Sequence, residues 1–184
     1  MASHKKKRPR SEIEDLLNLL DQAFNAAKLK YKVCGSIRRG KEEIGDVDIV
    51  VSDFSILSSA LSALATMGHF GRPGNGNFQK MTAKAPEEAK NLDYLIMGVQ
   101  FNFRKATPEQ WGAMVLYLTG DAKFNVGMRI IAKNQGYKLN QYGLWHGETC
   151  IAGKEERQIF DALGVEWYDP SKRDIKSYSL RRQK

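Results

Sequence analysis

The chain has 184 residues, 42% of them hydrophobic and 27% charged, a globular composition that excludes both a disordered chain and a large multidomain enzyme. It holds 29 Lys and Arg against 21 Asp and Glu, which gives a formal net charge of +8. The excess lies at the ends: residues 1–10 hold five bases and no acid, and residues 171–184 hold six bases and one acid. Two basic ends around a nearly neutral body predict binding to a polyanion, most simply nucleic acid, with solubility tails as the alternative.

The sequence shows no signal for secretion or for membrane insertion. It has no run of 18 apolar residues and no N-terminal basic stretch followed by an apolar run. Its two cysteines, Cys34 and Cys150, lack the spacing of a metal site or a disulfide framework. We therefore expect an intracellular protein that binds nucleic acid, in the cytoplasm or the nucleus. The run KKKRPR at residues 5–10 resembles a nuclear localisation signal, but we favour DNA contact.

The first half of the chain is expected to alternate helix and strand. Residues 11–28 place apolar side chains on one helical face, and Ser11 followed by Glu14 has the pattern of a capping box. The motif DVDIVV puts Asp46 and Asp48 on the same face of a strand. The expected elements after the first helix are, in order, a short strand or extended entry into a Gly-Ser turn at 31–36, a strand at 46–51, a helix at 55–67, a strand at 78–82 and one long strand, LDYLIMGVQF, at 92–101.

A second unit is expected to begin near Thr107-Pro108, where proline stands at a plausible first helical position. Two helices that end at Gly120 and Gly136 precede short strands, and a last helix ends at Gly164. The pattern predicts an α+β protein of two lobes.

The densest chemical signal is CGSIRRGKEEIGDVDIVV, residues 34–51. Two carboxylates on one face of a strand, Asp46 and Asp48, can together bind one divalent cation through oxygen. The backbone N–H groups of Gly35 and Ser36, the Ser36 hydroxyl and the Arg39 guanidinium can hold a triphosphate that shares this cation. The segment therefore predicts a site for a metal-bound nucleotide, with solvent-facing acids on a strand as the alternative.

A third acid would complete a site for two metal ions, and Asp93 is the best candidate. It lies in LDYLIM, whose apolar pattern fits a neighbouring strand. Strand pairing can bring Asp93 beside Asp46 and Asp48, although the spacing alone does not require it.

Four segments in order resemble the DNA polymerase beta superfamily of nucleotidyltransferases and, within it, the family X DNA polymerases. They are GSIRRGKEEIGDVD, LYLTGDAKFNVGMR, GYKLNQYGL and KEERQIFDALGVEWYDPSKRD. The resemblance implies a nucleotidyltransferase palm, a mixed sheet with helices on one face, over residues 11–106. A small α/β C-terminal subdomain follows over residues 107–174, and a basic flexible arm (1–10) and a basic tail (175–184) flank them. This layout resembles the minimal viral members of the family, so we expect no lyase activity.

The resemblance also implies roles for individual residues. Asp46, Asp48 and Asp93 would bind two Mg²⁺, with Mn²⁺ as a substitute, and Asp93 would accept the proton of the primer 3′-OH. Ser36 and Arg39, next to Gly35, would hold the β and γ phosphates. The remaining contacts are the sugar, base-pair, template and minor-groove positions: Tyr117, Leu118, Gly120, Asn125, Arg129 and Tyr142. The family often has an aromatic residue at 118, Asp at 122 and a basic residue at 95, where this chain has Leu118, Ala122 and Leu95.

We therefore predict a template-directed DNA polymerase that fills short gaps in DNA repair. It would use gapped or primer-template DNA and dNTP, release pyrophosphate and act as a monomer. A terminal or RNA-directed nucleotidyltransferase is the first alternative. A DNA-end-binding protein with an inactive palm is the second, and it requires a missing carboxylate; the prediction of Asp93 as the third acid argues against it.

Overall fold

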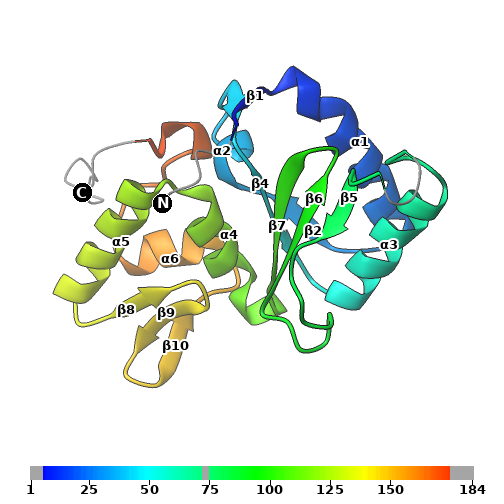
Figure 1. Ribbon diagram of the computed structural model, residues 1–184. Helices are drawn as coiled ribbons and strands as arrows, with labels where there is room; N and C mark the ends of the chain where they lie inside the picture. The colour runs from blue at the N-terminus through cyan, green and yellow to red at the C-terminus, as the bar shows by residue number, and fades with distance from the viewer. Residues whose placement is uncertain (1–5, 72–74, 175–184) are drawn as a thin grey trace. The chain divides into compact units, whose positions relative to one another are not determined.

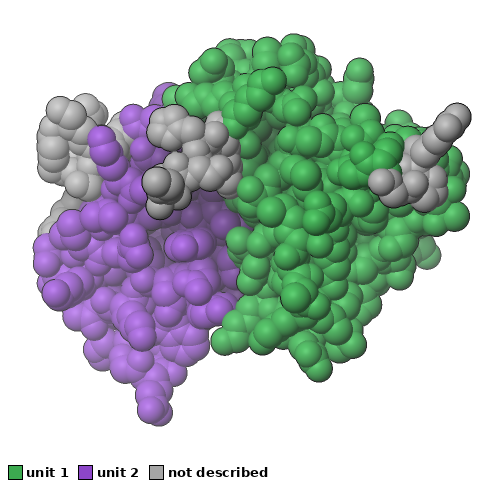
Figure 2. All heavy atoms as spheres, in the orientation of Figure 1, with its two compact units in different colours: residues 1–37, 41–105 green, residues 38–40, 106–184 purple. Residues whose placement is uncertain are grey.

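The computed structural model describes residues 6–71 and 75–174 and divides the chain into two compact units. Unit 1 comprises residues 1–37 and 41–105, and unit 2 comprises residues 38–40 and 106–184 (Figure 2). Both units combine helices with a sheet, so the α+β class predicted from the sequence is confirmed. In the described parts of the chain, no helix is long and apolar enough to cross a membrane.

Unit 1 is built on a five-stranded mixed sheet in the order β2-β4-β7-β6-β5 (Figure 1). Strands β4 and β7 are parallel, and the other neighbours are antiparallel. The elements of this half are β1 Arg8–Pro9, α1 Ser11–Ala26, β2 Tyr31–Val33, α2 Gly35–Arg38, β3 Glu43–Ile44, β4 Val47–Val51, α3 Phe54–Thr66, β5 Phe78–Lys80, β6 Asn91–Ile96 and β7 Val99–Lys105.

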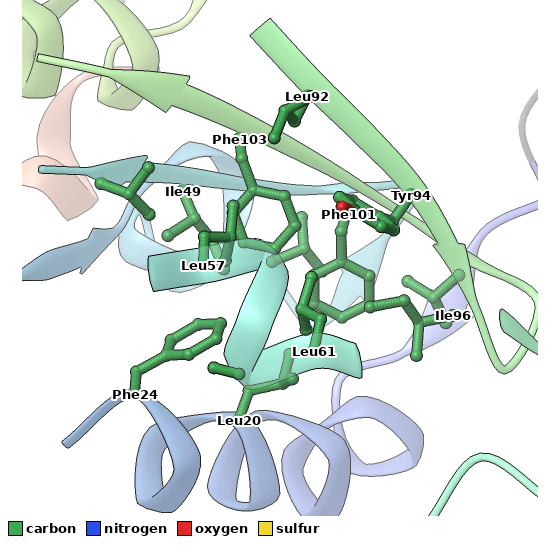
Figure 3. Close-up of a cluster of buried hydrophobic side chains, with 14 of the residues drawn as sticks. Leu20, Phe24, Ile49, Leu57, Leu61, Leu92, Tyr94, Ile96, Phe101 and Phe103 are labelled. Carbon is green, nitrogen blue, oxygen red and sulfur yellow. The ribbon is translucent and has the colours of Figure 1, made fainter. Parts of the chain in front are cut away.

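Helices α1 and α3 pack against one face of this sheet and leave the other face to polar side chains. Figure 3 shows Leu20 and Phe24 of α1 with Leu57 of α3 facing Ile49 and Phe103 of the sheet. Because side chains alternate along a strand, the residues between these apolar ones point to the opposite face. The opposite face of β4, β7 and β6 therefore carries the polar residues from which the candidate site is built.

The prediction of one strand over 92–101 is wrong, because the structure forms a hairpin of two strands there. Met97 and Gly98 have φ angles of 51° and 73° and make the tight turn between β6 and β7. Turns of this kind need two residues at positive φ, which glycine adopts without strain. As a result β7 lies between β4 and β6.

The N-terminal segment also differs from its prediction. Residues 8–10 are not a flexible arm, because Arg8 and Pro9 pair with Ile44 and Glu43, and the Arg10 N–H donates to Glu42. Arg10 takes the helix N-cap position predicted for Ser11, and its side chain binds Glu14 at 3.1 Å. Residues 1–5 and the predicted basic tail, 175–184, lie outside the described residues.

Unit 2 packs three helices and a three-stranded antiparallel sheet around its own apolar core. Asp121 caps the second of these helices by accepting from the Phe124 N–H, and Glu155 and Gln158 form a capping box at the third. The elements are η1 Pro108–Gln110, α4 Trp111–Thr119, α5 Ala122–Asn134, β8 Lys138–Asn140, β9 Gly143–His146, β10 Thr149–Ala152, α6 Glu156–Ala162 and η2 Pro170–Lys172.

Candidate active site

Asp46 and Asp48 lie at the start of β4, on the sheet face opposite the helices, and both are half-buried. Gly35, the first residue of α2, has φ +60° and approaches Asp48 closely. A Cβ atom at this position would lie 2.6 Å from Asp48 Oδ2, so only glycine lets the backbone come this near. The structure thus brings the Gly35-Ser36 turn to the carboxylates.

One amide side chain bonds to both carboxylates. It belongs to Asn102 of β7, a residue that the sequence reasoning missed. Its side-chain Nδ2 donates to Asp46 Oδ2 at 3.0 Å and to Asp48 Oδ1 at 3.1 Å. Its Oδ1 accepts from Gln100 Nε2 at 2.7 Å, and the residue is only 7% exposed. The available signal was Gly98, because a glycine inside a long strand pattern marks a break, after which Asn102 alternates with phenylalanines.

Asp93 does not join Asp46 and Asp48, which corrects the expectation that strand pairing brings the three acids together. It lies on β6, two strands from β4, and its cross-strand neighbour is Asn102. Its Oδ1 accepts from Arg104 Nη1 at 2.8 Å and its Oδ2 from Asn91 Nδ2 at 3.0 Å. Among the described residues, no three acidic, histidine or cysteine side chains gather as they would around a metal ion.

The donor set fits one divalent cation. Asp46 and Asp48 offer carboxylate oxygens, the ligands that Mg²⁺ prefers, and Mg²⁺ is commonly held by one or two carboxylates plus substrate phosphates. The third position in the row, opposite Asp48, holds a neutral amide. Two ions sharing three carboxylates therefore do not fit these residues as they stand.

The arginine pair at the C-terminal end of α2 belongs to unit 2. Arg39 donates to Asp174 Oδ1 at 3.0 Å and to the Thr119 carbonyl at 2.8 Å. Arg38 donates to Glu156 and to the Thr119 hydroxyl, each at 2.6 Å. Arg38 therefore stabilises unit 2, and Arg39, predicted to bind phosphate, makes an ion pair with Asp174.

A pocket of about 240 Å³, part of it open to solvent, lies on unit 2 at α4 and α5. It brings together three residues predicted for nucleotide or template contact: Tyr117, Asn125 and Arg129. Asn125 donates to the Tyr117 carbonyl at 2.7 Å, and a Cβ at Gly120 would lie 2.8 Å from Asn125 Oδ1. Gly120 is therefore needed for this packing.

Besides Gly120, the predicted contact residues Leu118 and Tyr142 lie outside the pocket lining. Leu118 is half-buried, and Tyr142, 39% exposed, sits in the turn between β8 and β9. The Tyr142 N–H donates to Asn140 Oδ1 at 2.8 Å. Asn140 itself lines the pocket, although the sequence reasoning did not select it.

Comparison with known proteins agrees with this architecture. The DNA polymerase beta palm model matches residues 7–72, and the DNA polymerase beta thumb model matches residues 114–174. DNA polymerase lambda of Rattus norvegicus is 29% identical over 89% of this chain, which spans 32% of that protein. Repair DNA polymerase X of African swine fever virus is 25% identical over 88% of this chain and 94% of its own length. The chain thus spans about a third of the rat protein but nearly all of the viral one.

A mixed sheet with two carboxylates beside a Gly-Ser turn, followed by a small α/β unit, defines a palm-and-thumb protein. Both matched family models describe these two parts. The chain belongs to the DNA polymerase beta-like polymerases, family X, as its sequence motifs predicted.

Proposed function

We propose that this chain is a template-directed DNA polymerase that adds dNMP from dNTP to a primer 3′-OH and releases pyrophosphate. The observation that carries the proposal is the half-buried pair Asp46 and Asp48 held against the Gly35-Ser36 turn, inside a chain that matches the family in both palm and thumb. Phosphoryl transfer asks the protein mainly for positioning and charge stabilisation, which such a site supplies.

The residues divide the work between binding and positioning. Asp46 and Asp48 hold the cation, which neutralises triphosphate charge when bound. Ser36 offers a hydroxyl for phosphate oxygens, and Arg39 would offer its guanidinium by exchanging its ion pair with Asp174 for phosphate. In unit 2, Tyr117 and Asn125 line a small open pocket and offer side chains for contact with a sugar and a base edge. With Leu118 half-buried outside that lining, rejection of ribonucleotides rests on the backbone and on Tyr117.

Gap filling in repair is the finer part of the proposal. The viral relative of similar length is named a repair polymerase. Three of the described bases near the N-terminus have intramolecular contacts: Lys7 with Glu43, Arg8 with Glu12 and Arg10 with Glu14. Release of those exposed pairs on DNA binding costs little, because such pairs contribute about 0–1 kcal/mol each.

The test is extension across a one-nucleotide gap with each of the four dNTPs and Mg²⁺ or Mn²⁺. We expect addition only of the nucleotide complementary to the gap, with loss of addition in Asp46→Asn. Addition that ignores the template would support a terminal transferase. No addition by a protein that still binds gapped DNA would contradict the proposed activity.

One observation favours a second candidate, a DNA-binding protein with little or no transferase activity. Asp93, the predicted third acid, lies two strands away from Asp46 and Asp48, and Asn102 lies between. The same gap assay, run beside a binding assay on the same DNA, separates the two candidates.

A further inference from the structure

Asn102 is the centre of a row of three residues on adjacent strands. It is the register partner of Asp48 on β4 and of Asp93 on β6. Side chains at paired positions of neighbouring strands lie on the same face of the sheet, about one strand spacing apart. Across the three strands the row therefore consists of the Asp48 carboxylate, the Asn102 amide and the Asp93 carboxylate, and the amide separates the two acids.

The amide competes with a cation for the same pair of carboxylates. Nδ2 of Asn102 lies 3.0 Å from Asp46 Oδ2 and 3.1 Å from Asp48 Oδ1, so one donor group serves both carboxylates. A cation shared by Asp46 and Asp48 takes carboxylate oxygens of both residues as ligands, and the amide already occupies one oxygen of each. Gln100 donates to the amide oxygen at 2.7 Å and so fixes the orientation in which the nitrogen faces the acids.

Asp93 supplies no replacement for the missing charge. Arg104, its diagonal neighbour on β7, donates to one of its oxygens at 2.8 Å, and Asn91 donates to the other at 3.0 Å. The two side chains of the Asp93–Arg104 ion pair are 22% and 29% exposed, which makes the pair a partly desolvated one. The charge of Asp93 is thus balanced within its own strand pair, and the acids that face a nucleotide carry two charges and not three.

We propose that Asn102 is a positioning residue that restricts this centre to one divalent cation and slows nucleotidyl transfer, and that an aspartate at this position would admit a second cation. The proposal deepens the proposed function and rests on it, because it concerns the same site. With Asn102, the centre would bind a nucleotide with one cation. With aspartate at this position, a second cation could also activate the primer hydroxyl.

The experiment counts bound Mn²⁺ by electron paramagnetic resonance in a complex of the full chain with gapped DNA, a dideoxy-terminated primer and the matching dNTP. We expect one Mn²⁺ per complex for the natural chain and two for Asn102→Asp. With an extendable primer, Asn102→Asp should extend at least ten-fold faster. The control is Gln79→Glu, which adds the same charge at an exposed position of β5 in the same sheet; neither the Mn²⁺ count nor the rate should change.

A second variant tests competition by the amide. Asn102→Ala removes the donor without adding charge, so the count should stay at one while Mn²⁺ binds several-fold more tightly. Weaker Mn²⁺ binding would contradict the competition, and this variant also serves if three adjacent carboxylates prevent Asn102→Asp from folding.

The outcomes separate the two proposals. Two Mn²⁺ in the natural complex, or no change in count and rate with Asn102→Asp, would overturn the role of Asn102 while leaving the polymerase assignment intact. A second Mn²⁺ in Asn102→Asp without templated addition by either protein would support the role of Asn102 and reject the polymerase assignment.

Discussion

The two units differ in how their buried or half-buried charged side chains are paired. In unit 2, Glu156 accepts from Arg38 at 2.6 Å and from Arg173 at 2.7 Å, and Arg173, fully buried, lies over the rings of Phe124 and Phe160. In unit 1, two carboxylates share the neutral amide of Asn102. Opposite charges that pair with one another stabilise the fold without a ligand. Two neighbouring carboxylates repel each other, and a bound cation would relieve that repulsion. The comparison therefore favours the acidic face of unit 1 as the candidate site and assigns the arginine cluster to the packing of unit 2.

The largest expected effect is on the stability of unit 2. Glu156→Gln removes the charge partner of a fully buried Arg173, and breaking a buried pair in this way costs about 3–5 kcal/mol. Chemical denaturation measures the loss. The control is Glu148→Gln at the exposed β9–β10 turn, where we expect a change below about 0.5 kcal/mol. Equal effects of the two changes would show that the cluster does not hold the unit together.

The acidic face of unit 1 should respond in the opposite sense. Asp48→Asn removes a cation ligand and a like-charge repulsion at once, so extension should fall by about 10²-fold or more, or about 2.7 kcal/mol, while the free energy of unfolding stays the same or rises. Single-turnover extension and denaturation of the same preparation measure both quantities. A parallel loss of activity and stability would place Asp48 among the structural residues.

The approach of Gly35 to Asp48 gives a smaller and separable effect. Gly35→Ala combines a positive φ with a Cβ 2.6 Å from Asp48 Oδ2, whereas Gly68→Ala has φ +83° and nothing within 4 Å. Backbone strain of this kind costs about 1–2 kcal/mol in either variant. We expect only Gly35→Ala to weaken Mn²⁺ binding as well, measured by titration in the presence of dNTP. Equal Mn²⁺ affinities in the two variants would show that the contact does not position Asp48.

Much of this architecture could be predicted because local pattern and tertiary structure agree. The helices of unit 2 follow their apolar periodicity and end near Gly120 and Gly136, and the DVD alternation places Asp46 and Asp48 together. The matched family models cover both the palm and the thumb.

Asn102, the third side chain of the candidate site, could not be found by a search for acidic residues. Periodicity runs through Met97 and Gly98 without a polar break, so two strands looked like one, and Gly98 was the one sequence signal of the turn that the positive φ angles show. A hairpin reverses the chain and inserts a strand, which changes the neighbour of Asp48 from Asp93 to Asn102. Arg173 was likewise counted among the basic residues of the C-terminal end, although its burial depends on rings and a carboxylate from elsewhere in unit 2.

The smallest expected effect, that of Asp93→Asn, tests whether Asp93 belongs to the candidate site. Asp93→Asn removes one partner of Arg104 in a partly exposed ion pair, so the free energy of unfolding should fall by about 1 kcal/mol or less. Extension across a one-nucleotide gap should change less than about three-fold, because Asp93 lies two strands from Asp46 and its charge is already balanced by Arg104. Single-turnover rates of Asp93→Asn and Asp48→Asn measured side by side make the comparison. A loss in Asp93→Asn as large as that in Asp48→Asn would mean that Arg104 releases Asp93 when DNA and nucleotide bind, so that the acidic face extends across three strands.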